Sequence, residues 1–279
     1  MEKRGKGTRI MERPPRPAPD ARVLEKIKHS FIVMSGKGGV GKSSVSANLA
    51  VALANKGYKV GLMDIDIHGP DIPRMLGLRE MIRINGNKKM EPVSYSPNLS
   101  AVSIESLMPD KDTAIIWRGP VKHTAIRQFI GDVDWGPLDF LIIDSPPGTG
   151  DEPLTIANLI QDARAIIVTT PQEVALADVR KSIRFCREVD MEIFGLVENM
   201  SGFACPCCGR VLDPFGTGGG QRTAIEAGIP FLGKIPMDPA VVACGDAGIS
   251  FQDRYPKSGV TGAFKRITDK MGRLLNKRE

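Results

Sequence analysis

Short apolar runs alternate with stretches of helical periodicity along most of this chain. Seven runs have the length and apolar content of strands buried on both faces of a sheet, and they occupy 29–34, 59–63, 99–104, 139–144, 165–170, 193–199 and 231–236. Helical segments are expected between most of them, at about 42–56, 120–131, 152–161, 173–188, 219–227 and 239–246. This alternation predicts a doubly wound α/β fold, in which a mostly parallel sheet is flanked by helices.

Three stretches depart from this alternation. Residues 1–28 lack periodicity and contain "RPPRPAP", so we expect a flexible basic tail ahead of one folded domain at 29–279. Residues 69–98 hold several Gly and Pro and predict an irregular excursion from the sheet. Residues 260–279 have apolar residues at helical spacing with basic residues opposite. They predict a C-terminal helix that either packs on the body, as we expect, or lies on a membrane surface.

The distribution of charge narrows the class of partner. The net charge is +6, but residues 1–28 carry +5 and residues 260–279 carry +4, which leaves −3 for the middle of the chain. Because the excess lies in the ends, we expect no nucleic acid partner. No apolar run approaches the roughly 20 residues that span a bilayer, and the N-terminus lacks the apolar core of a secretory signal. We therefore expect a cytoplasmic protein with reduced thiols and no membrane partner.

The stretch "GKGGVGKSS" indicates a phosphate-binding loop. It contains G-x-x-x-x-G-K-S directly after a predicted strand and at the start of a predicted helix, which is the context that this motif requires. Glycines let backbone N–H groups turn toward phosphate oxygens, and the helix N-terminus adds positive potential. Lys42 is expected to reach the β- and γ-phosphates, and Ser43 to hold Mg²⁺. The candidate nucleotide-binding residues of the loop are Gly36, Lys37, Gly38, Gly39, Val40, Gly41, Lys42, Ser43 and Ser44.

Lys37 is a second lysine, early in the same loop. It lies too far round the turn to duplicate the role of Lys42. Two interpretations are open: the side chain points toward the phosphates bound by a partner, or it is a solvated loop lysine.

Aspartates end two of the predicted strands. Asp64 and Asp144 follow apolar runs, and carboxylates at such positions support the water shell of Mg²⁺ in folds of this kind. Asp66, two residues beyond Asp64, is a candidate to orient the attacking water. The alternative for Asp64 and Asp66 is a capping role at the strand end. The Pro-Gly loop between Asp144 and Asp151 is a candidate for a segment that responds to the γ-phosphate.

Three of the five cysteines are crowded into "CPCC". Cys205 and Cys208 have the C-x-x-C spacing at which two sulfurs bind one metal centre. A structural zinc site would need four ligands, and a redox dithiol would normally lie at a helix N-terminus. A cluster shared by two chains takes two thiolates from each. All three interpretations are open from spacing alone; Cys207 has no assigned role, and Cys186 and Cys244 lie in apolar helices and are expected in the core.

The motifs together resemble those of the Mrp/ApbC-type P-loop ATPases, which carry iron–sulfur clusters and belong to the deviant Walker A class with MinD and ParA. The resemblance runs from about 29 to 254 and covers the blocks "KGGVGKSS", "DIDIHGPDIPRMLG", "DWGPLDFLIIDSPPGTGD", "ENMSGFACPCCG", "FGTGGG" and "IPFLGKIPMDP". Two positions depart from the family pattern, Asp71 and Ser145, where serine and leucine are usual. The family branch with an extra N-terminal cysteine cluster is excluded, because residues 1–185 contain no cysteine.

The resemblance implies a specific function. It implies a homodimer that binds ATP and Mg²⁺, hydrolyses ATP slowly, and transfers a [4Fe–4S] cluster held by Cys205 and Cys208 of both subunits to apo iron–sulfur proteins. Lys37, Lys42 and Asp66 would then be the catalytic residues, with Lys37 crossing the dimer interface. Asn199, Pro236 and Asp238 would frame the adenine. The alternative from another class is a MinD/ParA-like positioning ATPase without a metal cluster.

Overall fold

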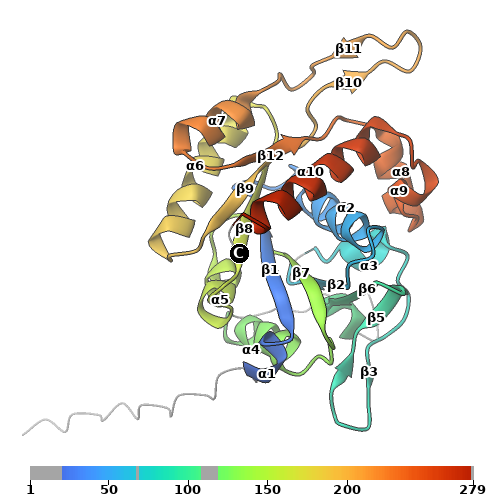
Figure 1. The fold of residues 1–279 in the computed structure, drawn as a ribbon, viewed down its shortest axis with the longest axis vertical. Coiled ribbons are helices and arrows are strands. Elements are labelled where there is room, and N and C mark those ends of the chain that lie inside the picture. The colour runs from blue at the N-terminus through green and yellow to red at the C-terminus, as the bar shows by residue number, and fades with distance from the viewer. Residues whose placement is uncertain (1–20, 67–68, 108–118, 278–279) are drawn as a thin grey trace, which may run out of the picture.

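An eight-stranded sheet forms the centre of the molecule (Figure 1). The structure is a computed structural model that describes residues 21–66, 69–107 and 119–277. The strands lie in the order β12 (Phe231–Lys234), β9 (Ile193–Glu198), β8 (Arg164–Thr169), β1 (Ile27–Met34), β7 (Leu138–Asp144), β2 (Val60–Asp64), β6 (Leu99–Ser103) and β5 (Val93–Ser96). All neighbours pair in parallel except β5, which is antiparallel to β6 at the edge. The predicted mostly parallel α/β fold is therefore confirmed.

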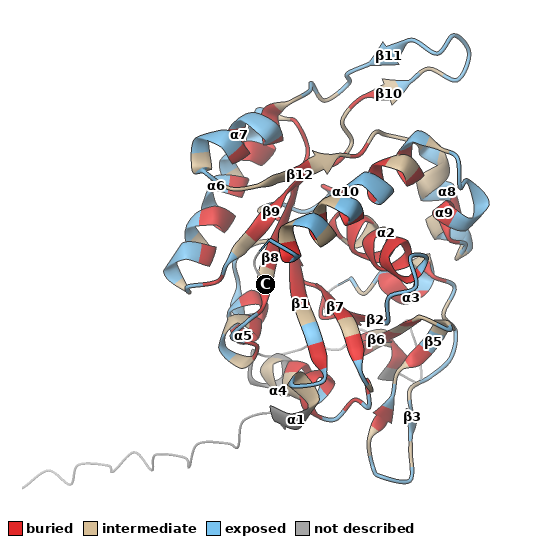
Figure 2. Ribbon diagram, viewed as in Figure 1, coloured by how far each residue is buried: buried red, intermediate tan, exposed pale blue. Residues whose placement is uncertain are grey.

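Helices cover both faces of the sheet because successive strand residues point to opposite sides. Phe31 and Val33 of β1 join a core with α2 (Lys42–Ala54) and α10 (Gly259–Leu275). Ile32 and Met34 face the other side and join a core with α4 (Gly119–Gly131) and α5 (Asp151–Leu159). Two further helices, α6 (Glu173–Glu188) and α7 (Gly219–Ala227), pack over β8 and β9. Figure 2 shows the resulting buried centre, with exposed residues on the outer faces of the helices.

The predicted strands and helices are all present, but the segments that connect them contain more helices and strands than expected. Within 69–98 lie α3 (Ile72–Met75), β3 (Arg83–Ile84), β4 (Met90–Glu91) and the edge strand β5. After these come the 3₁₀ turn η1 (Ile104–Leu107) and α9 (Phe251–Arg254), whereas α8 (Pro239–Ala247) is the helix expected at 239–246. The stretch 209–220 contains β11 (Val211–Leu212), which pairs with β10 (Phe203–Ala204). These elements are short, and short elements give weak periodic patterns.

The expected boundary between tail and domain at 28/29 is wrong. A short helix, α1 (Ala21–Leu24), precedes β1, and β1 begins at Ile27. Ile27 is buried in the core, and Leu138 N–H donates to Lys26 C=O. The polar residues on either side of Ile27 hide this first turn of the strand from a search for apolar runs. Residues 1–20 of the expected tail lie outside the described residues.

The C-terminal helix α10 packs on the body, as we expected from the sequence. Its apolar stripe is buried against α2 and β12, and it consists of Val260, Phe264, Ile267, Met271 and Leu275. Ser258 caps the helix by accepting from Thr261 N–H at 3.0 Å. In the part of the chain that the structure describes, no helix has the length and apolar character that a membrane crossing requires.

The position of Ile27 predicts different outcomes for two truncations. Deleting residues 1–28 removes a buried isoleucine and a backbone hydrogen bond of β1, and we expect the melting temperature to fall by about 3–10 °C. Deleting residues 1–20 serves as the control and should leave the melting temperature unchanged, because that segment lacks an apolar pattern. Thermal denaturation followed by circular dichroism distinguishes the two. Equal melting temperatures for the two truncations would show that Ile27 does not stabilise the sheet.

Candidate functional site

The candidate phosphate loop lies at the carboxyl edge of the sheet, between β1 and α2. Gly39 and Gly41 have φ of 80° and 79°, in the left-handed region that favours glycine. Gly41 is also the N-cap of α2, and a Cβ there would lie 2.4 Å from Asn199 Nδ2. The backbone is thus turned as a phosphate-binding loop requires, with a helix N-terminus directly behind it.

Of the other residues of the loop, some pack against the body of the protein and the rest are exposed to solvent. A Cβ on Gly36 would lie 2.3 Å from the backbone carbonyl carbon of Asp178 in α6, so this glycine serves a close contact between the loop and a helix. Lys37, Gly38 and Gly39 are exposed, and Val40 is buried in the core. The exposed outer rim, with Lys37 on it, is accessible to another molecule.

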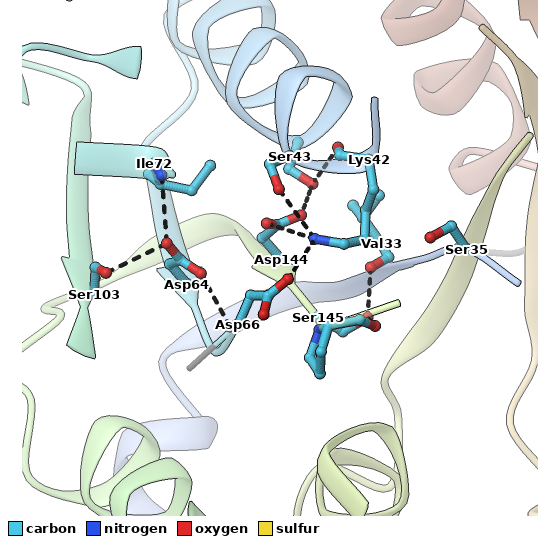
Figure 3. Close-up of polar contacts among 12 residues, drawn as sticks. Val33, Ser35, Lys42, Ser43, Asp64, Asp66, Ile72, Ser103, Asp144 and Ser145 are labelled. Carbon is cyan, nitrogen blue, oxygen red and sulfur yellow. Dashed lines mark hydrogen bonds and ion pairs between the residues drawn. The ribbon is translucent and has the colours of Figure 1, made fainter. Parts of the chain in front are cut away.

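Lys42 is buried among carboxylates at the start of α2 (Figure 3). Its Nζ lies 2.8 Å from Asp144 Oδ2 and 3.7 Å from Asp66 Oδ2, and it donates to Ser43 Oγ at 3.1 Å. Asp144 is fully buried at the end of β7, and its second oxygen accepts from Ser46 Oγ at 2.6 Å. The carboxylates thus hold the Lys42 ammonium beside the phosphate loop, where it can pair with an anion bound by the loop.

Asp64 organises the segment that follows β2 (Figure 3). Its Oδ1 accepts from Asp66 N–H at 3.0 Å. Its Oδ2 accepts from Ile72 N–H at 3.4 Å and from Ser103 Oγ at 3.3 Å. Burial raises the pKa of Asp64 well above its ordinary value, and the neighbouring Asp144 raises it further. Asp64 therefore positions Asp66 and α3, and its oxygens are already engaged with donors.

The Pro-Gly loop after β7 is joined to the phosphate loop through the end of β1. Ser145 Oγ donates to Val33 C=O at 2.9 Å, and Gly148 N–H donates to Ser35 C=O at 2.7 Å. Ser35 Oγ in turn donates to Lys37 C=O at 3.0 Å. The departure from the family pattern at Ser145 thus supplies one of these contacts. These hydrogen bonds connect the two loops directly.

The residues expected around the adenine lie in two places. Asn199, directly after β9, donates from Nδ2 to Val40 C=O at 2.9 Å and so contacts the phosphate loop. Asp238 is the N-cap of α8 and accepts from Ala240 N–H at 2.9 Å. Pro236 lies beside Gly259, at the start of α10. The structure therefore brings Asn199 to the loop and gives Asp238 a capping role.

The cysteines lie on a hairpin that projects from the body beside α7 and β12 (Figure 1). Strands β10 and β11 pair in antiparallel fashion, and the turn is closed by Cys205 N–H to Arg210 C=O and Gly209 N–H to Cys205 C=O. Cys207 and Cys208 are exposed and Cys205 is half-buried. The N–H groups of Cys207 and Cys208 lower the pKa of the Cys205 thiol, because they stabilise the thiolate. The turn is chemically suited to bind a metal through sulfur.

The other two cysteines are core residues, as expected. Cys186 in α6 and Cys244 in α8 are both buried. Burial raises the pKa of Cys186 to about 12. Neither thiol is available for chemistry in the folded protein.

Several residues of the site were missed by the sequence analysis. Ser46, which bonds Asp144, lies one helical turn after Lys42 and could have been found from the i, i+4 spacing. Ser35 and Glu198 belong to no recognised motif, and several of their partners, namely Gly148, Gly218 and Gly220, lie in other segments of the chain.

The fold and the phosphate loop define a P-loop nucleoside triphosphatase. Residues 26–272 match the family described as ParA: NUBPL iron-transfer P-loop NTPase, and the chain belongs to this family. The family resemblance noted from the motifs is therefore confirmed.

Individual relatives agree with this assignment. The iron-sulfur cluster carrier protein of Saccharolobus solfataricus is 48% identical over 253 residues, which cover 90% of this chain and 86% of that protein. The cytosolic Fe-S cluster assembly factor NUBP2 homolog of Dictyostelium discoideum is 46% identical over 251 residues, with 88% and 95% covered. A solved nucleotide-binding protein from Archaeoglobus fulgidus, in complex with ADP, is 40% identical with a TM-score of 0.72, covering 82% of this chain and 89% of that one.

The raised pKa of Asp64 predicts a specific dependence of stability on pH. Because the native pKa of Asp64 lies above its ordinary value of 3.8, the folded protein binds this proton more tightly than the unfolded chain does. The free energy of unfolding therefore falls as the pH rises from 3.8 toward the native pKa. Asp64→Asn cannot titrate. The stability of this variant relative to the wild type should therefore rise between about pH 5 and about pH 8 in urea denaturation.

Asp269→Asn is the matched control. Lys56 lowers the pKa of this exposed carboxyl, so its titration window lies below 3.8 and the relative stability should be the same at both pH values. If the difference between Asp64→Asn and the wild type also stayed constant, Asp64 would be fully ionised in the folded protein throughout this range.

Proposed function

We propose that this protein is an ATP-dependent homodimeric carrier that binds a [4Fe–4S] cluster and transfers it to apo iron–sulfur proteins. The observation that carries the proposal is the cysteine hairpin, with two suitably spaced sulfurs at an exposed turn and with a nucleotide loop at the same edge of the same sheet. Membership of an iron-transfer NTPase family and the printed names of the relatives support it. The name of the Dictyostelium relative also supports a cytosolic location.

The residues around Lys42 are suited to ATP hydrolysis. The loop amides and Lys42 bind the β- and γ-phosphates, and Lys42 neutralises charge that develops on them. Asp66, close to Lys42, orients a water for attack on the γ-phosphorus. The bond from phosphorus to the β–γ bridging oxygen breaks, and ADP and inorganic phosphate leave. Lys37 on the exposed rim reaches the phosphates of the partner subunit, which makes hydrolysis depend on the dimer.

The site fits a magnesium ion. Three carboxylates, those of Asp64, Asp66 and Asp144, lie around one lysine, and a hard divalent cation balances such an excess of oxygen ligands. Ser43 would hold the ion through its hydroxyl, with Asp144 beside the bound water. Asp64 would contribute less directly to binding of the ion, because both of its carboxylate oxygens already accept hydrogen bonds. When bound, the ion neutralises charge on the phosphates.

The cluster is the cargo of this protein, and its geometry requires two chains. A [4Fe–4S] cluster takes four thiolates, and each chain offers Cys205 and Cys208 at the tip of its hairpin. A two-fold axis through the paired hairpins supplies the other two. For the nucleotide, we propose that Asn199, Pro236 and Asp238 frame the adenine.

A MinD/ParA-like positioning ATPase without a metal is the competing function. It would need neither the C-x-x-C spacing nor the N–H groups that lower the pKa of Cys205. Concentrated protein purified without oxygen separates the two functions, since an iron–sulfur protein is brown and a positioning ATPase is colourless.

The two lysines of the loop are expected to have separable effects. Lys42→Ala should abolish ATP binding, because it removes the charge that neutralises the phosphates. Lys37→Ala should leave the dissociation constant for ATP within about threefold but lower hydrolysis about 10²–10³-fold. Binding is measured by calorimetry and hydrolysis by phosphate release, with the exposed Lys257→Ala as control. Wild-type turnover by Lys37→Ala would remove the proposed role of this lysine across the dimer.

The three hairpin cysteines are also expected to differ. Iron should titrate to about four atoms per dimer after anaerobic reconstitution. Cys205→Ala and Cys208→Ala should each abolish the cluster absorbance while ATP binding persists. Cys207→Ala is the matched control and should retain the cluster, because an adjacent thiol cannot easily face the same metal as Cys208. Full iron content in Cys205→Ala, or zinc at one per dimer when iron is available, would contradict the cluster assignment.

A further inference from the structure

Glu198 is a fully buried carboxylate at the last position of β9. Its Oε1 accepts from Ser201 Oγ at 2.5 Å and from Gly218 N–H at 3.0 Å, and its Oε2 accepts from Gly220 N–H at 2.6 Å. A buried carboxylate is costly unless hydrogen bonds compensate it, and bonds of this charged kind are short and strong. The mechanism proposed above gives this residue no part, so its three contacts call for a separate explanation.

The donors to Glu198 lie on both sides of the cysteine hairpin. Ser201 precedes β10, whereas Gly218 and Gly220 lie after β11, at the start of α7. One side chain therefore fixes both ends of the segment 201–218, which carries Cys205 and Cys208. Figure 1 shows this segment leaving and rejoining the body beside α7 and β12. This carboxylate therefore contributes to holding the hairpin in its orientation relative to the sheet.

The next residue along the chain contacts the phosphate loop. Asn199 donates from its side chain to Val40 C=O at 2.9 Å, and its backbone N–H donates to Thr169 C=O in β8 at 2.7 Å. A Cβ on Gly41 would overlap with Asn199, so the side chain lies directly against the loop. The residue that follows Glu198 is therefore in direct contact with the phosphate loop at Val40 and Gly41.

Backbone hydrogen bonds extend the same connection to the segment after β12. Ile235 N–H donates to Glu198 C=O, Ser201 N–H donates to Ile235 C=O, and Met237 N–H donates to Gly202 C=O, at 2.9, 2.9 and 2.7 Å. The first limb of the hairpin is thus held against the residues that precede Asp238. The path from the phosphate loop to the cysteines is a continuous set of short contacts within one sheet edge.

We propose that Glu198 is the positioning residue that couples nucleotide at the phosphate loop to the orientation of the cysteine hairpin. The proposal rests on the proposed function for its purpose, because it supplies the link between ATP and the exposure of the cluster. Binding of a nucleotide shifts Asn199, the end of β9 moves with it, and the Glu198 carboxylate passes the movement to Ser201 and Gly218 on the two limbs of the hairpin.

The test measures the reactivity of the hairpin thiols in protein that contains no iron. A maleimide labels the full chain with and without a non-hydrolysable ATP analogue and Mg²⁺, and mass spectrometry resolves Cys207 and Cys208. The buried Cys186 and Cys244 report any global unfolding. We expect the analogue to change the labelling rate of the wild-type hairpin by at least about fivefold.

Glu198→Gln should reduce this nucleotide effect to less than about twofold. Glutamine keeps the shape of the side chain, but its amide replaces an acceptor with a donor that faces N–H groups. Ser201→Ala removes one hydrogen bond and keeps the carboxylate, so it should lower the effect partly and remains informative if Glu198→Gln does not fold. Glu226→Gln, exposed on α7, is the matched control and should behave as the wild type.

The ratio of the rates with and without nucleotide separates coupling from simple support of the fold. If Glu198 only stabilised the structure, Glu198→Gln would raise both rates equally and leave their ratio unchanged, which would overturn the proposal. A wild-type hairpin that does not respond to nucleotide would also overturn it. Because these assays use protein without iron, their outcome does not depend on the cluster assignment. The cluster assignment is tested separately by the iron titration.

Discussion

The buried ion pair between Lys42 and Asp144 is the interaction on which the rest of the nucleotide site depends. Both groups are almost completely removed from solvent, and leaving either one unpaired would cost about 3–5 kcal/mol. The fold supplies the pair by placing the end of β7 next to the end of β1, in register at Val33 and Asp144. In the proposed function, a phosphate that binds Lys42 takes the place of the Asp144 carboxylate, and Asp144 keeps its hydrogen bond from Ser46.

The parallel sheet explains why the phosphate loop and the cysteine hairpin can be connected. In a parallel sheet all strands end at the same edge, so β1 leads into the phosphate loop and β9 leads into the cysteine hairpin on one side of the molecule. Glu198 and Asn199 end β9 with one side chain directed to each of these segments. Strand β8 lies between β1 and β9, and Asn199 N–H donates to Thr169 C=O of β8, so the two segments are connected within one sheet.

The sequence predicted those parts of the protein whose signals are local. Buried parallel strands are continuous apolar runs, and the phosphate loop and the C-x-x-C pair are compact motifs, so each was recognisable from neighbouring residues. The start of β1 was missed because Lys26 and Lys28 flank Ile27 and hide its apolar character. Strand β5 was missed because "VSYS" is a half-polar edge strand. The roles of Asp64 and Glu198 depend on donors 2–39 residues away in the chain, and these distances close only in the folded protein.

We propose that ATP at the phosphate loop controls release of a cluster held by the hairpins. The decisive measurement is the rate at which reconstituted protein transfers its cluster to a model apoprotein under anaerobic conditions, with and without Mg²⁺ and ATP. We expect ATP to change the transfer rate of the wild type by at least about fivefold and to leave the rate of Lys42→Ala unaltered. Equal wild-type rates with and without ATP, at full cluster occupancy, would contradict it.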